Sequence, residues 1–392
     1  MSPQHGVLDQ AAALAVNGGR PVSEKPVPFM STALSEADID AATAVLRSGM
    51  LRQATKCAEL EERYAAASEA KHALTCANGT TALQLAYEAL LERGDEVLVP
   101  AWTFIATASM IVARGCKPIF CDVLEDTYQI DVADAARRIT PKTKAIAVTH
   151  LYGCPVDIDA VEALAAKHGL KIIYDAAQAH LATYKVKGIG AFGDAVTYSF
   201  YATKNLGTGE GGLVTCNDEA LAQKMAALRS HGETGKYLHT SIGYNFRMND
   251  ITGAIGCSKL DRLPAQTNKR RAAAAKYDRF LSKIDGLNAP VTTAGAEPAY
   301  HLYTMQIDPA KFTCTRDEFC DALRAEGVPT AVHYPRPLTR QPAFEAFVTE
   351  HPPVVEKLAQ RVFSLPMHHD LSEAHHLIVE EAIGKVVDAF RA

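Results

Sequence analysis

The chain has 392 residues, of which 48% are hydrophobic and 22% are charged, an ordinary composition for a globular protein. At roughly 100 to 200 residues per domain, this length predicts two domains. The net charge of −5 argues against a nucleic-acid or anionic-membrane partner, because either would require a clustered basic face. The only tight basic triplet, Lys269-Arg270-Arg271, falls in a predicted helix, where we expect it to face solvent.

The nine cysteines are odd in number and include no CxxC pair, which suits neither a disulfide framework nor a zinc site. We therefore expect a reducing, cytoplasmic location. Two pairs of adjacent histidines, at 368–369 and 375–376, match no common ligand spacing, so we expect no metal. The longest uncharged run, residues 97–113, is shorter than the about 20 apolar residues of a membrane-spanning helix, and we expect no membrane span. Residues 1–20 carry no basic leader, so we expect an ordinary N-terminus.

Helical patterns come first along the chain. The first predicted helix covers residues 36–47, between Ser35 as an N-terminal cap and Gly49 as a C-terminal stop. A second helical pattern covers residues 59–67. Short strand patterns then alternate with helical patterns. We expect strands at 73–76, 96–99, 117–122, 145–148, 171–175, 196–200 and 213–216, and helices at 80–92, 105–114, 132–139 and 161–168. This alternation predicts right-handed βαβ units and an α/β fold with a mostly parallel sheet between helices.

The pattern changes from about residue 260 onward. A long helix is expected at 264–284, followed by a strand at 300–307, a helix at 316–326, a proline-rich stretch and a closing helix from Ser372. These elements predict a smaller α+β domain. We place the boundary so that residues 1–262 form the N-terminal segment and large domain, and residues 263–392 the small domain.

Asn78, Gly79, Thr80 and Thr81 follow the first strand of the alternating region and open its first helix. A glycine turn at a helix N-terminus offers free N–H groups and the positive end of the helix dipole to an anion. The alternative is a plain helix cap. The pattern is neither a Walker loop nor GxGxxG, which argues against a nucleotide triphosphate here.

Two ionisable side chains also follow predicted strands. Asp175 ends the apolar strand 171–175, where a carboxylate is costly to bury without a cationic partner. Lys204 lies in the glycine-rich loop 199–212, and a lysine held between apolar strands has a lowered pKa and can form a Schiff base. A surface lysine, or a salt bridge between the two residues, is the structural alternative. A protonated pyridine nitrogen would equally satisfy Asp175, with Gln178 supplying a neutral hydrogen bond nearby.

Trp102, the only tryptophan, follows the strand 96–99 and is either a core residue or an aromatic lid over a flat ring. An anion site, a stacking aromatic, a carboxylate for a ring nitrogen and a Schiff-base lysine together meet the requirements of pyridoxal 5′-phosphate (PLP). Each of these features follows a predicted strand, and ligands of open parallel sheets bind beyond the carboxyl ends of the strands.

Segments around these residues resemble the DegT/DnrJ/EryC1/StrS family of PLP-dependent sugar aminotransferases, over about residues 28–371. The segments are 78–83, 99–104, 150–153, 175–178, 199–212 and 243–248. The resemblance implies PLP fold type I, which is aspartate aminotransferase-like, with a large PLP-binding domain and a smaller C-terminal α+β domain. The chain departs from the family at Leu181, where glycine is frequent, and at Thr252, where glutamine is frequent. We expect a reshaped pocket wall near Leu181.

The resemblance implies a role for each ring-contacting residue. Lys204 would join PLP as a Schiff base and then move the proton between cofactor and substrate carbons. Asp175 would hold the pyridinium nitrogen, and Gln178 would bond the ring 3-hydroxyl. Trp102 would stack on the ring.

The resemblance also implies how the phosphate is held. Gly79, Thr80 and Ser199 would contact it, joined by Asn245 reaching across from a second subunit. This arrangement implies a homodimer whose active sites are shared.

For the substrates, the resemblance implies an amino-acid donor, most often glutamate, and a keto-sugar acceptor, particularly a nucleotide-linked 3-keto hexose, in a two-half, ping-pong cycle. Expected substrate contacts are Lys236, Tyr237, His239, Arg247, His333 and Tyr334. The N-terminal residues 16–22 resemble cyclitol-pathway members, which keeps a keto-cyclitol such as scyllo-inosose open as the acceptor. A non-catalytic regulatory protein with the same fold is the other alternative, disfavoured by the intact Lys204, Asp175 and Gln178.

Overall fold

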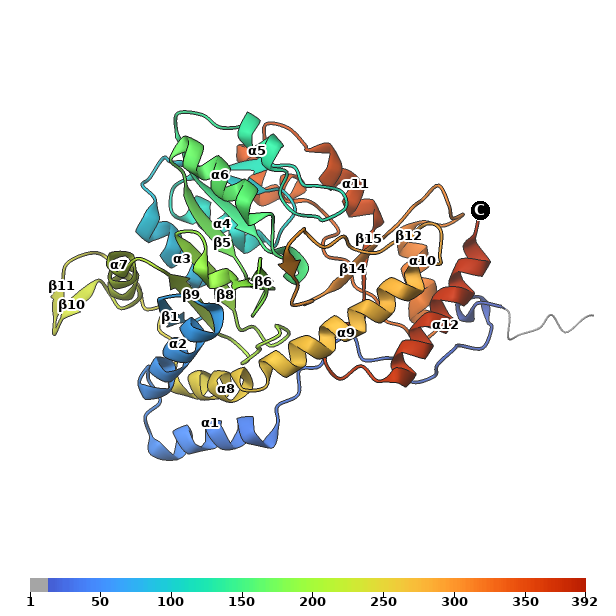
Figure 1. Cartoon of the computed structure of the whole chain (residues 1–392), viewed down its shortest axis with the longest axis horizontal. Helices are drawn as coiled ribbons and strands as arrows, with labels where there is room; N and C mark the ends of the chain where they lie inside the picture. The colour runs from blue at the N-terminus through green and yellow to red at the C-terminus, as the bar shows by residue number, and fades with distance from the viewer. Residues whose placement is uncertain (1–12) are drawn as a thin grey trace, which may run out of the picture.

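A seven-stranded sheet forms the centre of the computed structural model, which describes residues 13–392 (Figure 1). Its strand order is β1-β9-β8-β5-β4-β2-β3, and only β9 runs antiparallel to its neighbours. The strands are β1 (His72–Cys76), β2 (Glu96–Pro100), β3 (Lys117–Cys121), β4 (Thr143–Thr149), β5 (Lys171–Asp175), β8 (Ala195–Ser199) and β9 (Gly212–Cys216). The predicted strands and the mostly parallel sheet are confirmed, with ends shifted by one or two residues.

Helices cover both faces of this sheet because successive strand residues point to opposite sides. Val97 and Val99 of β2 face a core shared with α3, α4 and α7, whereas Leu98 faces a core shared with α2, α6 and α8. The helices are α1 (Glu36–Ser48), α2 (Thr55–Ser68), α3 (Gly79–Leu90), α4 (Ile105–Ala113), α5 (Val132–Arg137), α6 (Ile158–His168), α7 (Glu219–Arg229) and α8 (Asp250–Leu260). All were predicted except α7 and α8. Ser35 caps α1 and Gly49 ends it in a left-handed conformation, as expected.

A third core lies around a smaller antiparallel sheet of β12 (Leu287–Asn288), β14 (Tyr303–Ile307) and β15 (Val362–Leu365). It is built with α9 (Leu263–Leu281), α10 (Arg316–Ala325) and α12 (Glu373–Phe390), and α9 runs between the two halves of the molecule (Figure 1). Within the predicted triplet, Arg270 does not face solvent. It is 4% exposed, and its guanidinium donates to the carbonyl oxygens of Tyr300 and Met367.

Not every late segment packs on the third core. Residues of η4 (Leu338–Arg340), η5 (Pro342–Phe347) and α11 (Pro353–Arg361) join the core of the large sheet instead. The predicted division at residues 262 and 263 therefore describes the chain order but not the packing of this segment, and it stays a prediction. Residues 1–12, part of the predicted first unit and of the expected N-terminus, lie outside the described range.

Short elements complete the fold. They are η1 (Ala15–Asn17), η2 (Leu151–Gly153), η3 (Ile189–Ala191), the three-stranded sheet of β6 (Thr183–Tyr184), β7 (Lys187–Gly188) and β13 (Ala296–Glu297), and the hairpin of β10 (Glu233–Gly235) and β11 (Leu238–His239). The hairpin projects from the body at the far left of Figure 1. Residues 97–113 divide between β2 and α4 as predicted, and no helix in the described part of the chain is long and apolar enough to cross a membrane.

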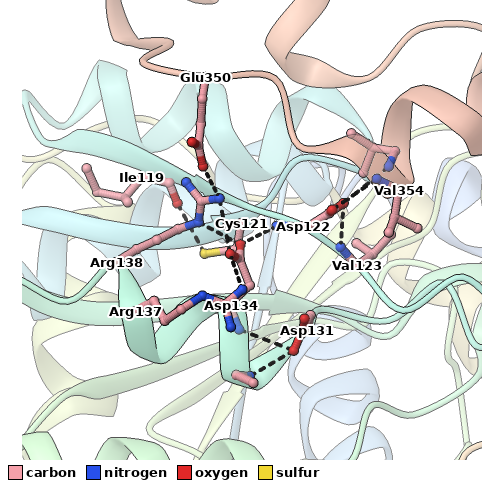
Figure 2. Close-up of polar contacts among 12 residues, drawn as sticks. Ile119, Cys121, Asp122, Val123, Asp131, Asp134, Arg137, Arg138, Glu350 and Val354 are labelled. Atoms are coloured by element: carbon pink, nitrogen blue, oxygen red, sulfur yellow. Dashed lines mark hydrogen bonds and ion pairs between the residues drawn. The ribbon is translucent and has the colours of Figure 1, made fainter.

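A cluster of charged side chains joins α5 and the end of β3 to the segment before α11 (Figure 2). We call Asp122, Asp134, Arg138 and Glu350 the Asp134–Arg138 cluster. Asp134 accepts from the Asp122 N–H at 2.8 Å and from Arg138 Nε at 2.6 Å, and Arg138 also pairs with Glu350. The Asp122 carboxylate accepts from two N–H groups in the first turn of α11. The cluster therefore ties residues 350–355 to the large sheet.

Candidate active site

A cavity of about 670 Å³ opens beyond the carboxyl ends of β4, β5 and β8, where the open-sheet rule predicts a ligand. Of the predicted residues it brings together Gly79, Thr80, Asp175, Gln178, Ser199, Lys204, His333 and Tyr334. Each is delivered by a strand end or by the loop that follows one, except the last two, which come from the strap 331–335 after α10. Residues as distant as 79 and 334 therefore meet in one space.

Asp175 lies at the end of β5 and is 5% exposed. Its Oδ2 accepts from the Thr107 hydroxyl at 2.6 Å, and its Oδ1 accepts from the Ala177 N–H at 3.0 Å. Burial raises the pKa of Asp175 above its usual value, although these two hydrogen bonds and the nearby Lys204 charge oppose the rise. A cationic partner placed in the cavity would stabilise the carboxylate.

Lys204 reaches the same cavity from the loop after β8. Burial lowers its pKa to about 8, and the negative charge of Asp175 only partly offsets this effect. Among the described residues, no carboxylate lies within the 4.0 Å ion-pair distance of its ammonium group. The salt bridge considered as a structural alternative does not form, so Lys204 keeps an amine that can be deprotonated near neutral pH.

The N-terminus of α3 forms one end of the cavity. Asn78 and Thr81 cap the helix reciprocally, so the plain-cap interpretation holds for these two residues. In the part of the chain that the structure covers, the N–H groups of Gly79 and Thr80 donate to no protein acceptor. A Cβ at Gly79 would lie 2.7 Å from Ser199 Cβ, so only glycine allows the helix to approach this strand end. The arrangement suits a phosphate.

Gln178 is held between the large sheet and the strap. Its Oε1 accepts from the Tyr152 N–H at 2.6 Å, and its Nε2 donates to the Tyr334 hydroxyl at 3.3 Å. His301 and His333 also line the cavity, and the Nδ1 atom of each has no partner among residues 13–392. Burial and the Lys204 charge lower the pKa of His333 to about 4, so its imidazole is neutral at pH 7.

Trp102 does not line the cavity, which corrects its predicted stacking role. It is 1% exposed, and its indole Nε1 donates to the Tyr152 hydroxyl at 2.9 Å. The core alternative considered for this residue is the one that the structure adopts. Phe104, two residues later at the start of α4, lines the cavity instead and is 56% exposed, so its ring is available to cover a ligand.

Five further predicted residues lie outside the cavity of their own chain. Lys236, Tyr237 and His239 belong to the exposed β10–β11 hairpin, and Tyr237 is 83% exposed. Asn245 is exposed and Arg247 is partly buried in the segment that leads to α8. Within the described chain the structure therefore does not bring these residues to Lys204.

Leu181 also lies outside the cavity, so the expected reshaping of a pocket wall at this position is wrong. Its φ of 55° lies in the left-handed region, which glycine occupies without steric cost. The frequent glycine at this position therefore has a backbone explanation. Thr252 lies in the first turn of α8, where its N–H donates to the Asn249 side chain.

The residues present fit PLP. The free N–H groups of Gly79 and Thr80 with the Ser199 hydroxyl suit its phosphate, and the buried Asp175 carboxylate suits a protonated ring nitrogen. Three cavity residues or their partners, Phe104, Thr107 and His301, were not predicted from the sequence. Phe104 could have been found as the second aromatic after β2, whereas Thr107 and His301 gave no local signal because their contacts depend on packing.

A second, larger hollow of about 1000 Å³ lies between the loop at 125–126 and the β12–β14 region. It is open to solvent, and two of its lining carboxylates are in ion pairs, Glu125 with Arg361 and Asp285 with Lys311. It holds no buried lysine or carboxylate aimed at a ligand, so the smaller cavity is the candidate active site.

Comparisons with known proteins identify the family of the chain. The model of the DegT/DnrJ/EryC1/StrS aminotransferase family matches residues 32–384. The chain is 42% identical over 316 residues to a UDP-N-acetyl-3-dehydro-alpha-D-glucosamine 3-aminotransferase of Acidithiobacillus ferrooxidans, covering 80% of this chain and 84% of that relative. It is 40% identical over 347 residues to a pleiotropic regulatory protein of Geobacillus stearothermophilus, covering 87% and 92%.

Among solved structures, S. venezuelae DesV in complex with a ketimine intermediate aligns with a TM-score of 0.89 and 35% identity, over 93% of this chain and 99% of that one. The α/β fold with its mostly parallel sheet is thus that of PLP-dependent aminotransferases. The chain belongs to the DegT/DnrJ/EryC1/StrS aminotransferase family, and it is an aminotransferase whose cofactor is PLP.

Proposed function

We propose that this enzyme transfers an amino group from an amino acid, most simply glutamate, to a nucleotide-linked 3-keto hexose in two half-reactions. The observation that carries the proposal is the cavity in which Lys204, with its lowered pKa, and the buried Asp175 both face the ligand space. Relatives named for 3-keto nucleotide sugars, such as the Acidithiobacillus ferrooxidans enzyme, support the acceptor class.

The chain's residues would divide the binding of PLP between its two ends. Gly79, Thr80 and Ser199 would hold the phosphate, and Phe104 would cover the ring face in place of Trp102. Asp175 would face the ring nitrogen, where a cationic partner offsets the cost of burying its charge. Bound PLP supplies an electron sink for the carbanion that forms in each half-reaction.

Lys204 would act twice. Its Nζ is the amine that attaches the cofactor, and it is deprotonated in a substantial fraction near its pKa of about 8. Once released by the donor's amino group, the same nitrogen would carry the proton to and from substrate carbon. The cavity lining allows this because among residues 13–392 no protein carboxylate holds the amine in an ion pair.

The part of the cavity lined by His301, His333 and Tyr334, where we place the acceptor, is polar, and these three side chains are uncharged. His301, His333 and Tyr334 line it, and the neutral imidazoles and the phenol can exchange hydrogen bonds with sugar hydroxyls. Residues 16–22, which motivated a cyclitol acceptor, lie elsewhere. They pack near Glu326, whose carboxylate accepts from the Ala15 and Val22 N–H groups. The nucleotide sugar is therefore the acceptor that we favour.

A homodimer with shared active sites is the second part of the proposal. The exposed hairpin 233–239, with Asn245 and Arg247, lies away from its own cavity, as residues that complete a partner's cavity would. A two-fold contact is the commonest way for one chain to present a surface to its own copy. Asn245 would then reach the phosphate site in the partner's cavity. The hairpin would contact the keto-sugar acceptor bound there.

Mixing two inactive variants tests the dimer. Lys204→Ala removes the reacting amine, and Asn245→Asp places a negative charge at the proposed phosphate contact. If the sites are shared, half of the randomly mixed dimers carry one intact site, and about a quarter of wild-type activity returns. If mixing restores no activity although mass spectrometry shows mixed dimers, the shared site is wrong.

The reaction itself is tested with a panel of acceptors. PLP-loaded enzyme with glutamate is offered UDP-N-acetyl-3-dehydro-α-D-glucosamine, other nucleotide-linked keto-hexoses and scyllo-inosose, and amine products are measured by mass spectrometry. Turnover of a nucleotide-linked 3-keto hexose is expected. Faster turnover of scyllo-inosose would favour the cyclitol. The absorbance of bound PLP should fall when glutamate is added to an enzyme. It should stay constant in a non-catalytic regulatory protein, the class that the name of the Geobacillus stearothermophilus relative indicates.

A further inference from the structure

The turn η2 after β4 contains Tyr152, a residue that contacts cavity-lining residues on three separate segments. Tyr152 is 5% exposed and has a φ of 57°, a left-handed conformation that is uncommon for a bulky side chain. The next residue, Gly153, is also left-handed, and a Cβ there would lie 2.8 Å from the Gln178 carbonyl oxygen. Such a conformation persists where the surrounding structure fixes it.

The Tyr152 backbone makes two of these contacts. Its N–H donates to Gln178 Oε1 at 2.6 Å, and its carbonyl oxygen accepts from the Leu302 N–H at 3.3 Å. Both partners line the cavity. The turn therefore fixes the Gln178 amide and the segment that carries His301.

The Tyr152 side chain makes the third contact. Its hydroxyl donates to the His333 carbonyl oxygen and accepts from Trp102 Nε1 at 2.9 Å. The Trp102 ring lies edge-on to Tyr334, with centroids 6.0 Å apart at 75°. The Tyr152 hydroxyl thus holds the strap at 333–334, from the C-terminal part of the chain, against the large sheet, beside the Gln178–Tyr334 hydrogen bond.

We propose that Tyr152 is a positioning residue, whose hydroxyl sets the place of His333 and Tyr334 and thereby the fit of the acceptor. This role rests on the proposed function, because it takes the strap to be the acceptor wall. It also gives Trp102 a task as the buried donor that fixes the Tyr152 hydroxyl, although Trp102 touches no ligand.

Tyr152→Phe isolates the hydroxyl, since the ring and both backbone hydrogen bonds remain. With the acceptor that wild-type enzyme aminates fastest, we expect KM to rise about tenfold, the size expected when buried partners lose a hydrogen bond. The kcat and the affinity for PLP should change far less, because Lys204 and Asp175 keep their contacts and the backbone N–H of residue 152 still donates to Gln178. Emission of Trp102, the only tryptophan, should shift to shorter wavelength in the cofactor-free protein.

Tyr128→Phe is the matched control. Tyr128 is buried and packs edge-on against Tyr152 at 5.5 Å, and its hydroxyl has no partner in the described part of the chain. Removing it should change neither KM nor emission. Unchanged emission in Tyr152→Phe would show that the Trp102–Tyr152 hydrogen bond is absent. Shifted emission with unchanged KM would show that the Tyr152 hydroxyl does not position the acceptor. Absence of turnover in wild type would instead refute the proposed function.

Discussion

Two buried aspartates, Asp175 and Asp122, lie at strand ends on the same carboxyl edge of the sheet, yet their surroundings differ. Asp175 is the last residue of β5 and lines the cavity. Its carboxylate accepts from one hydroxyl and one N–H and has no ion-pair partner among the described residues. Asp122 follows β3 and belongs to the Asp134–Arg138 cluster, in which the carboxylates accept from arginines and helix N–H groups (Figure 2). One edge of the sheet thus carries a carboxylate without a cationic partner, which we call the unsatisfied site, and a cluster in which Arg138 pairs with Asp134 and Glu350, which we call the satisfied one.

The pKa of Asp175 and the pKa of Asp134, the central carboxylate of the Asp134–Arg138 cluster, are shifted in opposite directions. Burial acts on both Asp175 and Asp134, and it raises the pKa of Asp175. Burial alone would do the same to Asp134, but hydrogen bonds from Arg138 and the Asp122 N–H hold its pKa below the usual value. A buried carboxylate without a cationic protein partner is a candidate ligand contact, whereas a carboxylate paired with arginines stabilises the fold.

The largest effect is expected at Lys204. Lys204→Ala should lower turnover by at least about 10³-fold, because both the attaching amine and the proton carrier are lost. Binding of PLP should persist through Asp175 and the phosphate site, measured by equilibrium dialysis. Lys259→Ala is the control, since burial also lowers the pKa of Lys259 but its side chain lies outside the cavity. Equal loss in both variants would contradict the assignment.

A matched pair of substitutions tests the comparison directly. Asp175→Asn should lower kcat/KM about 10²- to 10³-fold with little change in Tm, because a neutral amide cannot stabilise a protonated ring nitrogen. Asp134→Asn should lower Tm and leave kcat/KM near wild type, since it removes the buried carboxylate that pairs with Arg138 and leaves that guanidinium with Glu350 alone. If Asp134→Asn lost activity at unchanged Tm, the satisfied cluster would have to be functional.

The sequence could predict the sheet because the strand patterns are local, and it could predict Lys204 and Asp175 because both follow such strands. It could not distinguish Asp122 from Asp175, since each ends a predicted strand and only tertiary contacts decide which is satisfied. The exchange of Trp102 for Phe104 has the same cause. After β2 the chain buries Trp102, whose Nε1 donates to Tyr152 fifty residues away, and a contact at that sequence distance leaves no local pattern.

A smaller effect is expected in the satisfied cluster when its cation is removed. Arg138→Met should cost about 1–3 kcal/mol, because the buried Asp134 carboxylate loses its main cationic partner and keeps only Arg137 and the Asp122 N–H. In wild type this stabilisation is complete above the unfolded Asp pKa of about 3.9 and is lost as pH falls through the lower folded pKa. The difference in Tm between variant and wild type should therefore shrink below about pH 4. A constant difference from pH 7 to 3 would rule out this charge effect.

The smallest effect is a change in the titration of Lys204 when Asp175 loses its charge. The carboxylate raises the Lys204 pKa against the lowering by burial, so Asp175→Asn should move it further down, below about 8. Reductive methylation with ¹³C-formaldehyde and NMR titration of the cofactor-free protein would measure this, with the signal assigned by its absence in Lys204→Arg. The Lys259 signal should not move, because the charges that act on it are those of Asp38 and Arg262. An upward or absent shift at Lys204 would mean that the Asp175 charge does not act on this amine. The contrast between the cavity and the Asp134–Arg138 cluster would then lose its electrostatic basis.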